Sequence, residues 1–240
     1  MEDTYVQKLN WDTEFFNIKV GSIDISHFNL KEIDEVMKKA QNSLYRLVYL
    51  FDKELNAARS EMLVSYNGCE LVDTKIVFYK DLGDAKIYKE NCRDFLPTDD
   101  LDNLYFLALE SGKYSRYKLD LNFNYTDFER LYRTWIDKSI SGQIADKFIV
   151  YELKNRIIGF VSFRYQDKLS QIGLIAVAPE ARGMGVGKQL IACVEALSLR
   201  QGCIGMMVAT QEKNQIACSF YKQLNMIIKE KINIYHLWIQ

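Results

Sequence analysis

The feature that most constrains the fold lies at residues 172–190, IGLIAVAPEARGMGVGKQL. An apolar run rich in β-branched residues is followed by three glycines within five residues, and then by a long helical pattern. Glycine is unfavourable inside a helix, so a cluster just before one indicates a turn with special backbone angles. A strand, a glycine turn and a helix in this order predict an α/β unit in which backbone N–H groups and the helix dipole hold an anion.

Three phosphate-binding patterns compete for this loop. A Walker loop needs Ser or Thr after its lysine, but Gln189 follows Lys188. A dinucleotide fingerprint needs the spacing G-x-G-x-x-G, whereas these glycines are two residues apart. The third pattern, [QR]-x-x-G-x-[GA], is met by Arg182, Gly185 and Gly187. A purely structural turn is the less favoured alternative.

The third pattern, preceded by a strand that ends in Val177-Ala178-Pro179, resembles the acetyl-CoA-binding core of the GNAT superfamily of N-acetyltransferases. Residues 208–226, VATQEKNQIACSFYKQLNM, are similar to the next motif of that superfamily, which is a strand, an asparagine and a helix carrying a tyrosine. The resemblance covers roughly residues 96–240. It implies an α/β GNAT fold with a mixed, mainly antiparallel sheet.

The resemblance implies acetyl-CoA as the cosubstrate and no metal. The loop amides would hold the pyrophosphate, and the strand before the loop would pair with the pantetheine arm. The N–H of Ile175 would point at the thioester carbonyl, which makes it a catalytic group together with Tyr221. The expected acetyl-CoA-binding residues are Ile175, Val177, Arg182, Gly183, Met184, Gly185, Val186, Gly187, Lys188, Asn214, Ala217 and Tyr221.

Tyr221 is the expected general acid for the thiolate that leaves. It follows Asn214 by seven residues, which is two helical turns, so both lie on nearly the same helix face. The alternative is a core tyrosine, because the chain has 15 tyrosines. No general base is assigned: His27 and His236 are interpreted as structural, and Asp167 as a turn residue.

A narrower resemblance concerns the acceptor. Residues 9–23, 71–78 and 128–151 are similar to the dTDP-fucosamine acetyltransferases, a family that acetylates the 4-amino group of a dTDP-linked 4-amino-4,6-dideoxygalactose. This implies a nucleotide-linked amino sugar as the small-molecule partner. Two alternatives stay open: another amine (a different small molecule or a protein N-terminus), and an acyl-CoA-binding module without catalysis.

The hydrophobic pattern predicts two α/β domains, 1–95 and 96–240. The first reads β-α-β-α-β, with strands at 19–26, 45–51 and 69–82 and a helix capped by Asn29. A polar stretch at 84–94 is the expected boundary. The second reads α-α-β-β-β-α-β-α-β. The expected caps of its first two helices are Thr98 or Asp99, and a capping box of Thr126 and Glu129.

Composition narrows the class of protein. The formal net charge of the 240 residues is −1 and the basic residues are scattered, so neither nucleic acid nor a membrane is expected as a partner. Five cysteines, an odd number without C-x-x-C spacing, argue against a disulfide framework or zinc knuckle. We expect reduced thiols, no nucleophilic role for Cys218, a cytoplasmic location and, as the commonest assembly, a homodimer.

Two further groups of side chains have two interpretations each. An aromatic group either stacks on a base or sugar or seats the N-terminal unit on the core, and it consists of Trp11, Phe15 and Phe16. A basic group either meets a nucleotide diphosphate or is a solvated helix face, and it consists of Arg130, Arg133 and Lys138. In both cases the second interpretation is favoured.

Overall fold

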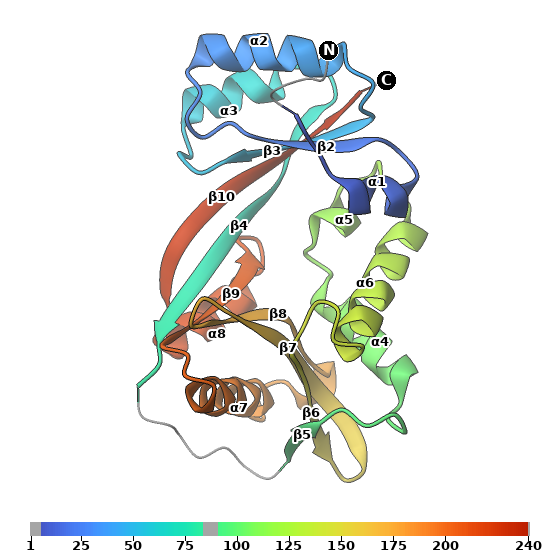
Figure 1. Ribbon diagram of the computed structural model, residues 1–240, viewed down its shortest axis with the longest axis vertical. Coiled ribbons are helices and arrows are strands. Elements are labelled where there is room, and N and C mark those ends of the chain that lie inside the picture. Colours follow the sequence, from blue (N-terminus) through green and yellow to red (C-terminus); the bar gives the residue numbers. More distant parts are fainter. Residues whose placement is uncertain (1–5, 84–90, 240) are drawn as a thin grey trace. The chain divides into compact units, whose positions relative to one another are not determined.

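A computed structural model of the chain describes residues 6–83 and 91–239 (Figure 1). Its backbone contacts separate into two compact units. The first unit comprises Met1–Ile76, Gln211–Lys213 and Glu230–Gln240, and the second comprises Val77–Thr210 and Asn214–Lys229. These units assign residues 77–95, 211–213 and 230–240 differently from the expected boundary at 95/96. The expected boundary separates domains that would each fold independently, whereas the units group residues by backbone contacts. The domain boundary therefore stays a prediction.

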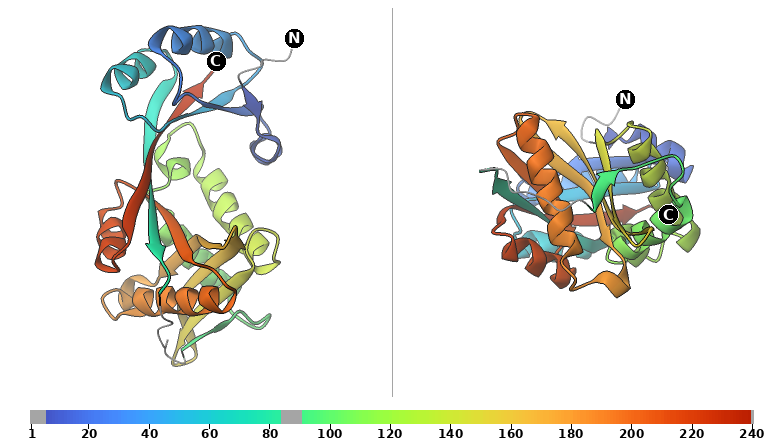
Figure 2. Two further views of the ribbon diagram at one scale, coloured as in Figure 1. Left: turned by 60° about the vertical axis from the view of Figure 1, so that its left-hand side comes forward. Right: turned by 90° about the horizontal axis from the view of Figure 1, so that it is seen from below.

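The first unit is an α/β layer. Its elements are β1 (Gln7–Lys8), α1 (Asn10–Phe16), β2 (Val20–Asp24), α2 (Leu30–Gln41), β3 (Leu47–Asp52), α3 (Ala57–Val64), and parts of β4 (Cys69–Asp81) and β10 (Ile227–Trp238). The strand order here is β1-β2-β3-β10-β4. β2 and β3 are parallel, and β3 and β10 are antiparallel. β4 and β10 lie side by side and are long enough to have residues in both units (Figure 2).

One face of the first unit's sheet is covered by α2 and α3 (Figure 1). Val48 and Leu50 of β3 pack in one apolar cluster with Ile33 and Met37 of α2. Asn29 caps α2 as expected, and its side chain accepts the N–H of Glu32 at 3.0 Å. The periodic pattern therefore predicted this helix, its cap and its buried face correctly.

The expected strands and helices of the first unit are present, but two elements precede them. The aromatic segment NWDTEFF forms the short helix α1, in which the rings of Trp11 and Phe15 stack with centroids 4.9 Å apart. β1 pairs with β2 in antiparallel register. Both elements are too short for periodicity to reveal them.

The second unit contains most of the mixed sheet. Its further elements are β5 (Cys92–Asp94), α4 (Leu101–Ser111), α5 (Arg116–Leu119), α6 (Tyr125–Ile140), β6 (Lys147–Leu153), β7 (Arg156–Gln166), β8 (Leu169–Val177), a 3-10 turn (Pro179–Ala181), α7 (Val186–Arg200), β9 (Gly205–Gln211) and α8 (Gln215–Gln223). The strand order is β4-β9-β8-β7-β6-β5. From β5 to β8, each strand pairs with the next one in antiparallel register, and β8 and β9 are parallel. The expected mixed, mainly antiparallel sheet is confirmed.

Helices cover both faces of this sheet. α7 packs against β6, β7 and β8 on one face, and α4 and α6 lie on the other (Figures 1 and 2). Two hairpins join β6 to β7 and β7 to β8. Their two-residue turns have positive φ at both positions, 52° and 59° at Lys154 and Asn155, and 50° and 60° at Asp167 and Lys168. Such turns match the twist of the strands, so Asp167 is a turn residue, as interpreted.

The caps of α4 and α6 correct the sequence prediction. Asp100, and neither Thr98 nor Asp99, accepts the first-turn N–H of α4, from Asn103 at 3.1 Å. Asp99 instead binds the guanidinium of Arg93 at 2.7 Å.

In α6 the capping pair lies two residues earlier than expected. The pair is Asn124 and Asp127, with the Asn124 N–H donating to Asp127 at 3.4 Å, in place of Thr126 and Glu129. Asn and Asp serve as well as Thr and Glu at these positions, so residue type alone could not decide the register.

Candidate active site

The glycine loop connects the end of β8 to the start of α7. After Val177 the chain makes one 3-10 turn and then passes through Gly183 and Gly185, both with φ of 82°. A Cβ at either position would meet no atom within 4 Å. Glycine is therefore needed here for the left-handed backbone and not for space. The open surroundings also leave these backbone groups accessible to a ligand.

The third glycine has a different role. A Cβ at Gly187, in the first turn of α7, would lie 3.1 Å from the ring of Phe220 in α8. Gly187 thus allows α7 and α8 to approach closely. Gly183 and Gly185 thus serve the turn and Gly187 also serves helix packing, while the expected pyrophosphate cradle of the three glycines stays a prediction.

The N-terminus of α7 is suited to an anion. Gly185, the cap residue, has no side chain, and among the described residues no side chain caps this helix end. The first-turn N–H groups of Val186, Gly187 and Lys188 therefore carry the positive end of a 15-residue helix dipole. Arg182 lies beside them and pairs with Glu110 at 3.3 Å.

β8 loses its neighbour β9 halfway along. The parallel pairing runs from Leu169–Gly205 to Ile172–Val208 and extends no further between these two fully described strands. The other edge of β8 stays paired with β7 up to Val177. Residues 173–177 therefore form a strand segment with one unpaired edge, which we call the open edge.

A bulge marks the start of the open edge. Ile172 pairs with Phe163 and Leu174 pairs with Ser162, so Gly173 is an extra residue in β8. The N–H of Leu174 donates to the Ser162 hydroxyl at 3.1 Å. Ser162 is buried. Its side chain thus fixes the orientation of the backbone where the open edge begins.

The bulge determines which amides face the open edge. The N–H of Leu174 points to β7, and so does that of Ala178, which donates to the Ile158 carbonyl at 2.8 Å. Successive N–H groups alternate along an extended strand. The N–H groups of Ile175 and Val177 therefore face the open edge. The expected role of Ile175 needs this orientation, although the role itself stays a prediction.

Asn214 is the N-cap of α8. Its side-chain oxygen accepts the N–H of Ala217 at 3.2 Å. The acceptor end of this amide is therefore used within the protein, and its NH₂ group is the part that is suited to a ligand. Ala217 contributes through its backbone to the cap.

Tyr221 lies two turns further along α8 and is 3% exposed. Its ring contacts those of Phe78 and Phe220, with centroids 5.4 and 5.3 Å away. This burial raises the pKa of Tyr221 well above its usual range, so the phenol stays protonated at neutral pH. A protonated phenol is what a general acid requires, and a packed ring is what a core tyrosine shows. Both interpretations remain compatible with this packing.

Both histidines belong to the first unit. His236 of β10 is buried with its ring 4.9 Å from that of Tyr49, and His27 is exposed after β2. The basic residues of α6 have acidic neighbours: Arg130 pairs with Asp127 at 3.0 Å. These positions agree with the structural interpretation of both groups.

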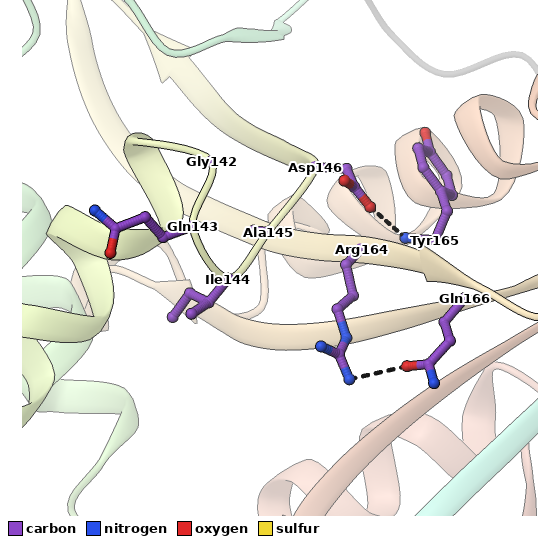
Figure 3. A pocket seen from close by; sticks show the side chains of 8 residues that line it. All are labelled: Gly142, Gln143, Ile144, Ala145, Asp146, Arg164, Tyr165 and Gln166. Atoms are coloured by element: carbon purple, nitrogen blue, oxygen red, sulfur yellow. Dashed lines mark hydrogen bonds between the residues drawn. The ribbon is translucent and has the colours of Figure 1, made fainter. Parts of the chain in front are cut away.

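A polar hollow of about 420 Å³, which the sequence did not indicate, lies at the far end of β7 (Figure 3). It is lined by residues 142–146 and 164–166. The Tyr165 N–H donates to Asp146 at 2.6 Å, and Arg164 donates to Gln166 at 2.9 Å. Arg164–Gln166 pair with the half of β8 that is bonded on both edges, so the hollow does not border the open edge.

Within 6–83 and 91–239, no group of three or more His, Cys, Asp or Glu side chains is arranged to hold a metal ion. In the same residues, no helix has the length and apolar character needed to span a membrane.

The site geometry defines a class of ligand. A strand with free N–H groups along one edge can pair with an extended, amide-bearing chain. The glycine turn and the helix N-terminus directly after it can hold phosphate. A coenzyme A thioester combines these two features, an amide-bearing arm and a pyrophosphate.

Comparison with known proteins agrees with this class. The Acetyltransferase (GNAT) family profile matches residues 100–226. An acetyltransferase of Pectobacterium atrosepticum is 26% identical over 99 residues, which cover 39% of this chain and 70% of that protein. The chain therefore belongs to the GNAT acetyltransferase family, and it is an acyltransferase that uses acetyl-CoA.

Solved structures share the fold over the whole chain. A GCN5-related N-acetyltransferase from Sphaerobacter thermophilus superposes with a TM-score of 0.63 at 16% identity, covering 98% of this chain and 76% of its own. A protein of unknown function from Staphylococcus epidermidis gives a TM-score of 0.63 at 12% identity, covering 100% and 93%. These similarities concern the fold alone.

Proposed function

We propose that the protein acetylates the amino group of a nucleotide-linked amino-deoxysugar, with a dTDP-linked 4-amino sugar as the expected acceptor. The family gives the donor and the reaction class. The acceptor rests on the sequence similarity of residues 9–23, 71–78 and 128–151 to dTDP-fucosamine acetyltransferases. The structural observation that supports the donor side is the open edge of β8 leading into the glycine loop.

In this proposal the donor is bound mainly by backbone groups. The pyrophosphate is held by the amides of Gly183 to Lys188, and the pantetheine arm pairs with residues 173–177. The NH₂ group of Asn214 donates to a carbonyl of that arm. Because the backbone makes these contacts, the loop conformation matters more than the identity of the exposed side chains.

The chemical step is direct attack of a neutral amine on the thioester carbonyl. A C–N bond forms, the C–S bond breaks, and the amine proton passes to water. The Ile175 N–H stabilises the oxyanion, an effect typically worth about 3 kcal/mol per donor. Tyr221 gives its proton to the departing thiolate, which leaves as the free thiol of coenzyme A, and water returns a proton to the Tyr221 phenolate, so the amine proton is balanced by the thiol proton.

A thiol-release assay with acetyl-CoA tests the acceptor. The panel contains a dTDP-linked 4-amino-4,6-dideoxy sugar, the same sugar without its nucleotide, a UDP-linked amino sugar and spermidine. We expect the highest kcat/KM with the dTDP sugar and a loss of at least tenfold without the nucleotide. Turnover of spermidine or the free sugar at an equal or higher kcat/KM would overturn the acceptor assignment.

Location and assembly are also proposals. We expect a cytoplasmic homodimer, and light scattering coupled to gel filtration measures the mass of the assembly directly. A monomeric mass at micromolar concentration would refute the dimer.

A further inference from the structure

All five cysteines are free thiols, and two of them lie in neighbouring elements of the second unit. Cys92 is on β5, the strand at the edge of the sheet, and it is partly exposed. Cys193 is on α7, the helix that follows the glycine loop, and it is 2% exposed. The two residues are far apart in sequence, but β5 packs against α7.

The Cys92 sulfur lies against the turn of α7 that Cys193 closes. Its Sγ is 3.9 Å from the carbonyl oxygen of Gln189. In an α-helix that carbonyl accepts the N–H of the residue four positions later, which is Cys193. Cys92 therefore lies within one helical turn of Cys193.

This contact makes the two thiols unequal. The hydrogen bond from Cys193 lowers the pKa of the Cys92 thiol, because it stabilises the thiolate. The same bond, with burial, raises the pKa of Cys193, which therefore keeps its proton. Burial raises the pKa of the thiols of Cys69, to about 12, and of Cys203. The thiol of Cys92, whose pKa is lowered, is thus next to a second thiol.

We propose that Cys92 and Cys193 are a modification site for hydroperoxides and close to a reversible disulfide that joins β5 to α7. The site is independent of the acceptor that the enzyme uses. Its chemistry requires only the two thiols and one peroxide.

The reaction balances in two steps. The Cys92 thiolate attacks the peroxide, takes one hydroxyl and becomes a sulfenic acid, while the other oxygen leaves as hydroxide and is protonated to water. The Cys193 sulfur then attacks the sulfenic sulfur of Cys92. The S–S bond forms, and the hydroxyl leaves with the Cys193 proton as a second water. In sum, two thiols and one hydrogen peroxide give one disulfide and two waters.

Peptide mapping tests this proposal on the full-length protein. The protein is treated with hydrogen peroxide, denatured, blocked with N-ethylmaleimide and digested with trypsin. Cleavage after Lys and Arg releases residues 90–93, ENCR, and 189–200, QLIACVEALSLR, so the disulfide links two peptides of defined mass. We expect this linked pair, its loss with dithiothreitol, and a fall from five titratable thiols to three.

Three variants make the test specific. Cys92→Ser and Cys193→Ser should each abolish the linked peptide and the paired loss of thiols. Cys203→Ser, which removes a buried thiol outside the pair, should leave the linked peptide at the wild-type yield. Five unreacted thiols after peroxide, a linkage to another cysteine, or a disulfide between two chains would overturn the proposal.

Discussion

The two halves of β8 differ in one respect that separates scaffold from site. Residues 169–172 are bonded to β7 on one edge and to β9 on the other, whereas residues 173–177 are bonded to β7 alone. The change occurs at Gly173, where one extra residue shifts the register. A strand of ordinary composition thus gains an unpaired backbone edge, the proposed binding surface, because it loses a neighbour.

The largest effect is expected at Tyr221, the proposed acid for the thiolate that forms beside the open edge. Tyr221→Phe keeps the ring that packs between Phe78 and Phe220 and removes only the hydroxyl. General acids contribute about 10²–10⁴-fold, so kcat should fall by that range while the Kd of acetyl-CoA stays within about twofold. Steady-state kinetics and calorimetric titration measure both quantities.

A matched control tests whether the effect belongs to the reaction. Phe78→Leu disturbs the same ring packing but leaves the hydroxyl of Tyr221 in place. It should lower the free energy of unfolding, and it should reduce kcat much less than Tyr221→Phe does. If Tyr221→Phe retains near-normal turnover, Tyr221 is a core residue and the acid must be sought elsewhere.

The next largest effect on kcat is expected at one of two buried serines, which lie on the two halves of the β7–β8 ladder. Ser162 accepts the Leu174 N–H at the bulge, whereas the hydroxyl of Ser170 in the paired half has no partner among the described residues. Ser162→Ala removes the hydroxyl that accepts this N–H, so the free energy of unfolding should fall by about 0.5–1.5 kcal/mol. Because the open edge would lose its orientation, kcat should also fall about tenfold, ~1.4 kcal/mol of barrier.

Ser170→Ala is the matched substitution in the paired half. Removing a hydroxyl without a partner relieves a desolvation cost, so stability should stay unchanged or rise, and kcat should stay the same. Urea unfolding and kinetics of the two variants decide the comparison. Equal losses of kcat in both would show that the bulge does not orient the reacting backbone.

The same comparison shows what the sequence could reveal. The glycine spacing, the asparagine and the alternating elements are local patterns, and they predicted the loop, the fold class and the long helices. The open edge depends on where β9 stops pairing with β8 and on a side chain of β7 that accepts a β8 amide. These are contacts between separate strands, so no local period reports them.

Short elements and long-range neighbours were missed for the same reason. β5 has three residues and α5 has four, which is less than one period of a reliable pattern. The proximity of Cys92 and Cys193 follows from sheet order, since β5 becomes the edge strand beside which α7 packs. Only the tertiary structure could show that pair.

Substitutions at two glycines distinguish a requirement for backbone conformation from a requirement for close packing. Gly185 has φ of 82° and open space around it, whereas a Cβ at Gly205, in the paired region of β9, would lie 2.7 Å from the Tyr79 ring. Gly185→Ala forces an unfavourable left-handed residue, costing about 1–2 kcal/mol, and should weaken acetyl-CoA binding about tenfold. Gly205→Ala should lower the melting temperature but leave the Kd of the folded protein unchanged. Equal Kd values for the two variants would contradict a pyrophosphate site in the loop.

The smallest effect concerns pH. Burial raises the pKa of Tyr221 above its usual value of 10.0, so the folded enzyme holds this proton beyond the pH at which an exposed tyrosine loses it. Tyr221 must be protonated to act as an acid, so it should cause no fall in kcat below about pH 10. The rise of kcat on the acidic side of the profile then reports only the deprotonation of the acceptor amine. The kcat profile between pH 7 and 10, at saturating acetyl-CoA, should rise or stay flat. A descending limb with an apparent pKa near 10 that disappears in the residual activity of Tyr221→Phe would contradict this prediction, because it would mean that the hydroxyl titrates like that of an exposed tyrosine.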